Sequence, residues 1–282
     1  MTRLLITGGS SYLGRHLTPP AAVGRQVTYT YYTHDPLNLP GGVRLDLRDA
    51  TAVTDLIRRT RPEVIIHTAG SNRVDDMHTV IVAGTRHVAQ AAEAVNARLI
   101  HLSTDVVFNG RCAPYRESDP PTPLHAYGRA KAAAEEIVRT YSNHVIIRTS
   151  LIYGLEQMDR GTAWIAGALR AGQPVTLFTD QMRNPVWVQT LCQACLELAG
   201  ADFVGVLNVA GRQALSRADF ALRLLDWWGV QERATLSLGA SDPARWPRDC
   251  TLDLTRATAV LQTPLPGVDE LLAAQAGRRP PA

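Results

Sequence analysis

Residues 98–131 read RLIHLSTDVVFNGRCAPYRESDPPTPLHAYGRAK, and the rest of the chain is organised around this stretch. It begins with an apolar run, 98–103, that predicts a strand buried in a parallel sheet. Its alanine-rich end predicts a helix as far as about Ser142, and 144–149 (HVIIRT) predicts the next strand. Strands that alternate with long helical segments are typical of an α/β fold with a doubly wound parallel sheet.

The same stretch holds three side chains that suit carbonyl chemistry. Tyr127 and Lys131 lie four residues apart, which places a phenol and an ammonium on one face of a helix. A tyrosine titrates near pH ~10 unaided, and a cation one turn away favours the phenolate and lowers its pKa. We therefore expect Tyr127 to transfer a proton while the hydroxyl of Ser103 or Thr104 holds the substrate oxygen. Taken alone, this spacing also fits a helix start followed by a solvated lysine.

The amino-terminal segment predicts a strand, a glycine-rich turn and the start of a helix. Residues 3–7 (RLLIT) run into 8–14 (GGSSYLG), an arrangement that brings a pyrophosphate to a helix N-terminus. Ser11 stands where the backbone must approach the phosphates, so it either weakens cofactor binding or donates its hydroxyl to a phosphate oxygen. An interior proline costs about 3 kcal/mol, so Pro19 and Pro20 predict a kink or a restart of the helix.

The end of the second strand, predicted at 26–32 (QVTYTYY), governs the choice of cofactor. An acidic residue there would bind a free ribose 2′-hydroxyl, whereas basic and hydroxyl groups suit a 2′-phosphate. Thr33 and His34 stand at this end, Asp35 comes one residue late, and Arg15 is another candidate partner for a phosphate. We expect NADP(H), with NAD(H) as the alternative; otherwise Arg15 and His34 are merely exposed.

Ala69, Gly70 and Ser103 each follow or end a predicted strand, where ligands of open α/β sheets bind. Small residues at Ala69 and Gly70 let a cofactor ribose pass close to the backbone. The remaining predicted elements of this half are strands at 43–47 and 63–68 and a long helix over 74–97.

The pattern of elements changes after Ser150. We expect residues 1–150 to form a dinucleotide-binding domain, joined by a helix and a strand that return at about 184–209. Residues 151–282 would then form mainly a smaller, C-terminal substrate-binding lobe. Within it, 215–228 predicts an amphipathic helix capped by Ser216.

Composition and charge narrow the class of protein. The chain has 282 residues, 45% hydrophobic and 20% charged, and its net charge of +3 includes no block of lysine or arginine. We therefore expect no nucleic-acid partner. No apolar run approaches the ~18 residues of a membrane span, so we expect no membrane association either. The first residues lead directly into a strand, which predicts a cytoplasmic protein without a signal peptide.

Cysteine and histidine spacing does not suggest a metal site. Cys192 and Cys195 form a Cys-x-x-Cys pair, but they lie in an apolar helical pattern without a second pair or a nearby histidine. Two buried thiols are the expected outcome. The histidines are scattered, and no metal is expected.

Four motifs around residue 110 resemble those of a known family. They are STD at 103–105, VFNG at 107–110, PYRESDPPTP at 114–123 and YGRAK at 127–131. Together they resemble the extended short-chain dehydrogenases/reductases of the dTDP-4-dehydrorhamnose reductase type, with a Rossmann-type fold. The regulatory beta subunit of methionine adenosyltransferase is similar over the same stretch.

The resemblance implies an oxidoreductase that uses NAD(P)H to reduce a 4-keto group on a nucleotide-linked deoxysugar, as in dTDP-rhamnose biosynthesis. It makes Thr104, Tyr127 and Lys131 the catalytic residues. The implied cofactor-binding residues are Gly8, Ser10, Ser11, Tyr12, Leu13, Arg15, Thr33, His34, Asp46, Leu47, Ala69, Gly70, Ser103, Tyr127 and Lys131. The implied substrate-binding residues are Thr104, Asp105, Asn109, Arg183 and Asn184.

Two other functions stay open on the sequence. The fold could serve a nucleotide-binding regulatory subunit without catalytic activity, or a sugar-nucleotide epimerase or dehydratase. A dehydratase would need a pair of carboxylates beside the threonine, and only Asp105 is present there. A homodimer is a possible assembly.

Overall fold

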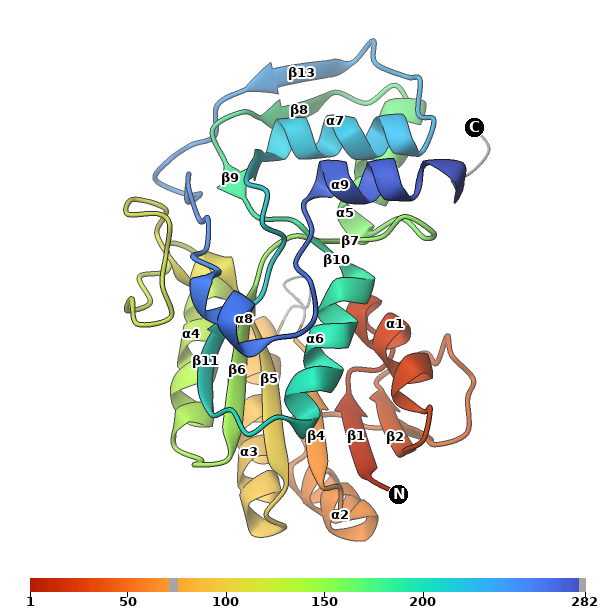
Figure 1. Cartoon of the computed structure of the whole chain (residues 1–282), viewed down its shortest axis with the longest axis vertical. Helices are drawn as coiled ribbons and strands as arrows, with labels where there is room; N and C mark the ends of the chain where they lie inside the picture. The colour runs from red at the N-terminus through yellow and green to blue at the C-terminus, as the bar shows by residue number, and fades with distance from the viewer. Residues whose placement is uncertain (71–75, 279–282) are drawn as a thin grey trace.

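A computed structural model describes residues 1–70 and 76–278 of the chain, and within them seven parallel strands form the central sheet of the larger lobe (Figure 1). In spatial order the strands are β11 (Gly205–Asn208), β6 (His144–Thr149), β5 (Arg98–Thr104), β4 (Val64–His67), β1 (Arg3–Thr7), β2 (Gln26–Tyr31) and β3 (Gly42–Arg44). Every neighbouring pair is parallel. The strand order runs outward in both directions from β1 and β4, so the predicted doubly wound sheet is confirmed.

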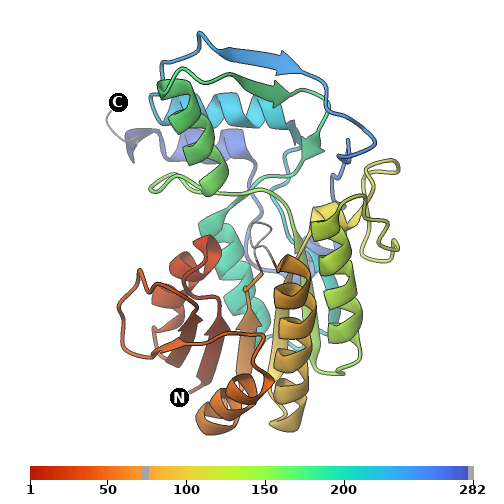
Figure 2. The same ribbon diagram turned by 180° about the vertical axis from the view of Figure 1, so that it is seen from behind.

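Helices cover both faces of this sheet because its strands are apolar on both sides. Leu4 and Ile6 of β1 pack in the cluster that contains α1 (Tyr12–Ala21) and α6 (Val188–Gly200). Leu5, which points to the opposite face, packs with the helices of that face. These are α2 (Ala50–Thr60), α3 (Gly84–Ala94) and α4 (Ala126–Arg139), which Figure 2 shows side by side.

The smaller lobe has apolar clusters of its own, above the carboxyl ends of the strands in Figure 1. Its main pair of strands is β8 (Val175–Phe178) with β13 (Leu236–Gly239), packed against α5 (Arg160–Arg170) and α7 (Arg217–Trp227). Two short pairs are β7 (Ile152–Tyr153) with β10 (Val186–Trp187), and β9 (Met182–Arg183) with β12 (Leu215–Ser216). The remaining elements are α8 (Thr255–Val260), α9 (Val268–Ala274), the 3-10 turns η2 (Asp105–Val107) and η3 (Ala276–Arg278), and the π-helical turn η1 (Thr79–Ala83).

Three local predictions are confirmed: the returning strand, the cap of α7 and the burial of the two cysteines. The returning strand β11 pairs with β6 and extends the sheet, and Ser216 caps α7 by accepting the N–H of Asp219 at 2.9 Å. Cys192 and Cys195 are buried in the core with 1% and 0% of their surface exposed. Among the helices of the described ranges, none has the length and apolar character that crossing a bilayer requires.

The predicted restart of the first helix at its prolines is wrong. α1 continues through Pro19 and Pro20 and ends at Ala21. The prolines lie in its last turn, so the missing N–H groups leave only the carbonyls of Arg15 and His16 without their helical partners. The hydroxyl of Thr18 donates to the carbonyl of Gly14 at 2.8 Å and adds a hydrogen bond within the same helix.

Two other predicted elements differ in extent. The strand expected at 43–47 ends at Arg44, although Leu45 and Leu47 still point into the core. The helix expected over 74–97 is divided into η1 and α3 and ends at Ala94, and its first two predicted residues lie outside the described ranges.

Candidate active site

The end of β5 and the start of α4 bring the three predicted catalytic residues into one region. Thr104 is the last residue of β5, and α4 begins after His125, whose Nδ1 accepts the N–H of Gly128 at 3.1 Å. Lys131, one turn into α4, donates from Nζ to the carbonyl of Leu102 in β5 at 2.5 Å. Tyr127, one turn earlier, is half-buried, and its hydroxyl has no hydrogen-bond partner among the described residues.

Composition singles out Lys131 in a way that spacing does not. Of the 29 lysine and arginine residues in the chain, it is the only lysine. Arginine therefore accounts for the other 28 of these residues, whereas this buried position keeps a compact ammonium whose pKa responds to its surroundings. The signal was present in the sequence and independent of the Tyr-x-x-x-Lys pattern.

The expectation that Lys131 lowers the pKa of Tyr127 is wrong for this arrangement. Burial, with the Asp105 carboxylate adding to it, raises the pKa of Tyr127 to about 12. Burial also lowers the pKa of Lys131 to about 8, against the opposing charge of Glu135. The ammonium is engaged with β5, so loss of solvent dominates at the phenol. Tyr127 is therefore protonated at neutral pH, the form that can donate a proton.

Asp105 orients its neighbours instead of facing solvent. Its carboxylate accepts the hydroxyl of Ser150 at 2.6 Å and that of Thr104 at 3.2 Å, and Arg183 Nε lies 3.6 Å away. Burial raises the pKa of Asp105, and the Arg183 guanidinium opposes that rise. The contact with Thr104 ties the hydroxyl expected to hold the substrate oxygen to a buried carboxylate.

The other predicted substrate-binding residues have protein partners. Arg183, 3% exposed, donates to the carbonyls of Met182 at 2.7 Å, Arg248 at 2.9 Å and Pro247 at 3.0 Å. Asn184 donates to the Gly211 carbonyl at 3.1 Å and accepts the Leu252 N–H at 2.8 Å. Asn109 accepts the N–H of Arg111 at 3.1 Å and the hydroxyl of Tyr115 at 3.0 Å. These bonds organise the surrounding loops, and direct substrate contact by the three residues stays a prediction.

The glycine turn after β1 leaves room only for glycine at its two ends. Gly8 has a φ of +76°, and a Cβ built on it would lie 2.8 Å from Ala69 Cα. A Cβ on Gly14 would lie 2.2 Å from the carbonyl oxygen of Gly8. Ser11, between them, accepts the N–H of Gly14 at 3.0 Å, so its hydroxyl caps α1. Ala69 and Gly70 follow β4, so the turn stands where the strand order reverses.

The start of α1 suits an anionic diphosphate. Its first turn holds no acidic residue, and Arg15 Nε is buried without a hydrogen-bond partner among the described residues. A helix N-terminus and an unpaired guanidinium both favour negative charge. Leu13 packs into the core, Ser10 is half-buried in the turn, and the Tyr12 hydroxyl donates to the Gln157 carbonyl at 2.8 Å. The residues present therefore fit the diphosphate of a dinucleotide cofactor.

The end of β2 has an arginine that the sequence reading missed. Arg48 donates to the hydroxyl of Tyr32 at 2.8 Å and forms an ion pair with Asp46 at 2.7 Å. This pairing lowers the pKa of Asp46. Thr33 and His34 are exposed beside Tyr32, whereas Asp35 accepts the hydroxyl of Tyr29 at 2.7 Å and is turned into its own loop. The free groups at this strand end are therefore hydroxyl and basic.

Two predicted cofactor contacts have other partners in the structure. The side chain of Leu47 is buried, and its carbonyl oxygen accepts a hydrogen bond from Nδ1 of the His87 ring at 2.8 Å. Ser103 donates its hydroxyl to the buried carboxylate of Glu135 at 2.5 Å. Glu135 in turn pairs with Arg148 of β6 at 2.9 Å, and both side chains are fully buried. No pattern in the sequence distinguishes this pair from solvated charges.

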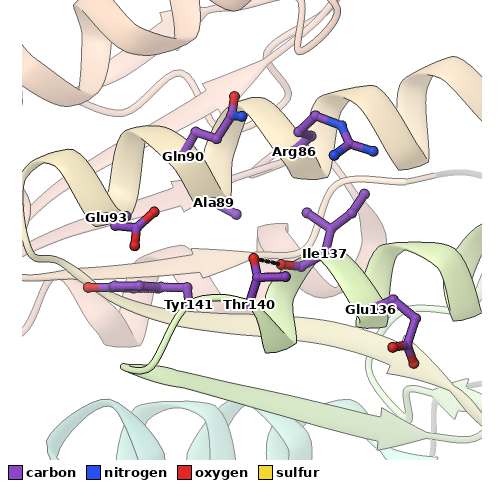
Figure 3. A pocket seen from close by; sticks show the side chains of 8 residues that line it. All are labelled: Arg86, Ala89, Gln90, Glu93, Glu136, Ile137, Thr140 and Tyr141. Carbon is purple, nitrogen blue, oxygen red and sulfur yellow. Dashed lines mark hydrogen bonds between the residues drawn. The ribbon is translucent and has the colours of Figure 1, made fainter.

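Two hollows in the surface lie away from these groups. One, of about 230 Å³, lies between α3 and α4, and its lining includes Arg86, Glu136 and Thr140, whose hydroxyl donates to the Ile137 carbonyl (Figure 3). The other has a volume of about 580 Å³, and its lining includes Arg212 and Thr255. Neither includes a predicted site residue. In ranges 1–70 and 76–278, no group of three or more His, Cys, Asp or Glu side chains could hold a metal ion.

Known proteins match this chain over nearly its whole length. The family model of the RmlD substrate binding domain matches residues 1–276. A dTDP-4-dehydrorhamnose reductase of Streptomyces griseus is 33% identical, over 93% of this chain and 89% of its own. The methionine adenosyltransferase 2 subunit beta of Xenopus tropicalis is 27% identical, over 64% of this chain and 59% of its own.

Solved structures agree with the fold. A hypothetical dTDP-4-dehydrorhamnose reductase from Sulfolobus tokodaii has a TM-score of 0.82 and 28% identity, and the match covers 95% of this chain and 98% of that one. The dTDP-4-dehydrorhamnose reductase of Bacillus anthracis, solved in complex with NADP, has a TM-score of 0.81 and 24% identity over 99% of both chains. The second likeness is evidence for the fold alone.

Proposed function

Because this chain belongs to the family of the RmlD substrate binding domain, we propose that it is an NAD(P)H-dependent oxidoreductase that reduces a 4-keto group on a nucleotide-linked deoxysugar. One observation carries the proposal: Lys131 bonds β5, while the hydroxyl of Tyr127, one turn away, has no hydrogen-bond partner among the described residues and is influenced by the charge of Asp105, the neighbour of Thr104. A phenol, an ammonium and an alcohol are thereby gathered where ligands of such sheets bind.

Each of the three residues has a distinct part in the reaction. NAD(P)H, when bound, supplies the hydride that reduces the carbonyl carbon. Tyr127 donates its phenolic proton to the carbonyl oxygen, which becomes the hydroxyl of the product. Thr104 donates a hydrogen bond to the same oxygen and orients it. Lys131 places a positive charge beside the tyrosinate that remains after proton transfer, and this charge stabilises it.

The cofactor-binding residues favour NADP(H). The turn from Gly8 to Gly14 and the start of α1 would hold the diphosphate, with Arg15 as a further cation. Thr33, His34 and Arg48 offer hydroxyl and basic groups for a 2′-phosphate, whereas Asp35 is bonded to Tyr29 and Leu37. NAD(H) stays the alternative. Asp46 forms an ion pair with Arg48, and this reduces the positive charge available to a 2′-phosphate.

We also propose the remaining features expected from the sequence. Residues 1–150, with the returning segment at about 184–209, would bind the dinucleotide, and 151–282 would contribute most of the substrate contacts. The protein would act in the cytoplasm on a nucleotide-sugar substrate, as a homodimer, and without a metal ion. Sedimentation of the purified chain tests the dimer.

Turnover by the purified protein tests the activity. Incubation with NADPH and a dTDP-4-keto-6-deoxysugar should oxidise the nicotinamide, followed by its absorbance. Tyr127→Phe should lower kcat by about 10²- to 10⁴-fold, since the proton donor is lost, with the Kd for NADPH little changed. Tyr141→Phe is the matched control, because its hydroxyl donates to the Ala97 carbonyl away from the site. Turnover retained by Tyr127→Phe would contradict the assignment.

The similarity to a methionine adenosyltransferase subunit keeps a regulatory role as the second candidate. A regulatory subunit has no need of a reactive tyrosine, lysine and threonine together, so we rank it below the reductase. Co-purification of a second enzyme in fixed ratio, with no turnover of any keto-sugar, would favour it. Tightly retained NAD in the purified protein would instead favour an epimerase or dehydratase.

A further inference from the structure

Two buried histidines lie directly behind Lys131. His67 of β4 and His101 of β5 are opposite each other in the sheet register, with 1% and 0% of their surface exposed. Their ring centroids are 5.2 Å apart. His101 Nε2 lies 3.1 Å from Lys131 Nζ, whereas His67 is held by the hydroxyls of Thr7 at 2.6 Å and Thr85 at 3.1 Å.

The donors and acceptors of this group determine the tautomer of His101. A lysine ammonium has three N–H donors and no acceptor, so Nε2 of His101 must accept. The proton of the neutral ring therefore lies on Nδ1, which is buried and has no partner among the described residues. The carbonyl of Leu102 accepts a second ammonium proton. The third N–H of Lys131 is bonded to neither of these two acceptors.

We propose that His101 is a positioning residue: its Nε2 and the Leu102 carbonyl hold two of the three N–H bonds of Lys131, so that the third is directed toward the reaction site. Lysine needs such support because its ammonium stands at the end of a flexible four-carbon stem. The part of this inference that concerns turnover rests on the proposed reductase function; the part that concerns the geometry of Lys131 does not.

The surrounding charges favour a neutral, accepting His101. Burial, the Lys131 cation and the neighbouring His67 together keep the pKa of His101 well below its usual value. From α4, Glu135 faces the ammonium but is paired with Arg148 of β6 and Arg139. The Asp105 carboxylate adds to the rise in the pKa of the Tyr127 phenol. His101 is therefore the uncharged acceptor that Lys131 meets on the sheet side.

The single lysine makes a direct test possible. Protein labelled with ¹³C and ¹⁵N in lysine gives one side-chain signal, that of Lys131, which can be followed against pH. His101→Leu removes the acceptor, and His101→Gln restores an oxygen at a similar reach. We expect His101→Leu to move the lysine signal, to lower its titration midpoint, and to reduce kcat by about 10²-fold, as a displacement of roughly 1 Å can do. His101→Gln should recover most of both.

His144→Leu is the matched control. His144 is also a buried histidine of the sheet, but its ring contacts the carbonyl of Tyr141 at the far end of β6. The His144→Leu variant should unfold more easily than the wild type, while its lysine signal and its kcat stay close to the wild-type values. A folded His101→Leu variant with an unmoved lysine signal would overturn the proposal.

If His101→Leu does not fold, the wild-type protein still allows a test of the proposal. The ¹⁵N shifts of His101 report its tautomer, and a proton on Nδ1 supports the proposal whereas one on Nε2 overturns it. If no keto-sugar is turned over by the wild type, the proposed function fails, and the lysine signal still decides whether His101 positions Lys131.

Discussion

Ser11 shows how one side chain stabilises the glycine turn between β1 and α1. Sequence alone allows its hydroxyl either to reach a phosphate oxygen or to leave the turn too crowded for one. In the structure it accepts the N–H of Gly14 and lies 3.3 Å from the hydroxyl of Thr68. It therefore satisfies one of the free N–H groups that begin α1.

Substitution of Ser11 separates capping from cofactor binding. Ser11→Ala should lower the free energy of unfolding by about 1 kcal/mol, because the cap of α1 is lost, whereas Ser11→Gly should cost only a few tenths. Urea denaturation of the two variants measures the difference. If Ser11→Ala keeps wild-type stability but binds NADPH more weakly, the hydroxyl serves the phosphate instead.

The pKa of Tyr127 also depends on contacts that the spacing of residues does not describe. The Tyr-x-x-x-Lys spacing correctly predicted that both side chains lie on one helix face, but it predicted the wrong direction for the tyrosine pKa. Spacing describes only which side chains are neighbours along the helix. Burial and the Asp105 carboxylate of η2, neither of which follows from the helix spacing, decide the sign.

At the scale of elements, a buried ion pair joins α4 to the sheet beside the active site. Glu135 of α4 binds Arg148 of β6 and Ser103 of β5, and the Arg148 guanidinium lies 4.9 Å from the Phe108 ring centroid. Arg148 also donates to the carbonyl of Glu117 at 3.2 Å. One carboxylate thus connects the helix that holds Tyr127 and Lys131 to two strands.

Glu135→Gln should therefore be strongly destabilising. It leaves the Arg148 guanidinium buried without its counter-charge, a change that typically costs about 3–5 kcal/mol. The next residue on α4 supplies the control: Glu136 is 68% exposed and pairs with Arg139 at the surface, so Glu136→Gln should cost less than about 1 kcal/mol. Equal unfolding midpoints in urea for the two variants would argue against a structural role for the pair.

At the scale of the whole molecule, the buried histidines link stability to pH. Burial and the Lys131 charge lower the pKa of His67 to about 3, and the pKa of His101 also falls well below its usual value. Both rings stay neutral in the folded chain but take up protons on unfolding below about pH 6.5. The unfolded state then binds more protons, so stability is lost as the pH falls through that value.

Each such histidine should contribute a slope of about 1.4 kcal/mol per pH unit between roughly pH 4 and 6. The free energy of unfolding in urea, measured at several pH values, gives the total slope. His101→Gln should make this slope shallower by about one such increment. A slope that His101→Gln does not alter would show that His101 is protonated in the folded state.

The sequence by itself determined the order of strands and helices in the central sheet and its doubly wound topology, and it proposed Thr104, Tyr127 and Lys131 as the catalytic set. These follow from local periodicity and from short motifs, which the chain carries within a few residues. Only the tertiary structure decided that α1 runs through its prolines, that Ser11 is a cap and that Arg183 and Asn184 have protein partners. The reason is physical: hydrogen bonds and burial depend on groups far apart in the chain, such as Arg183 with Pro247 and Ser103 with Glu135, which no local pattern pairs.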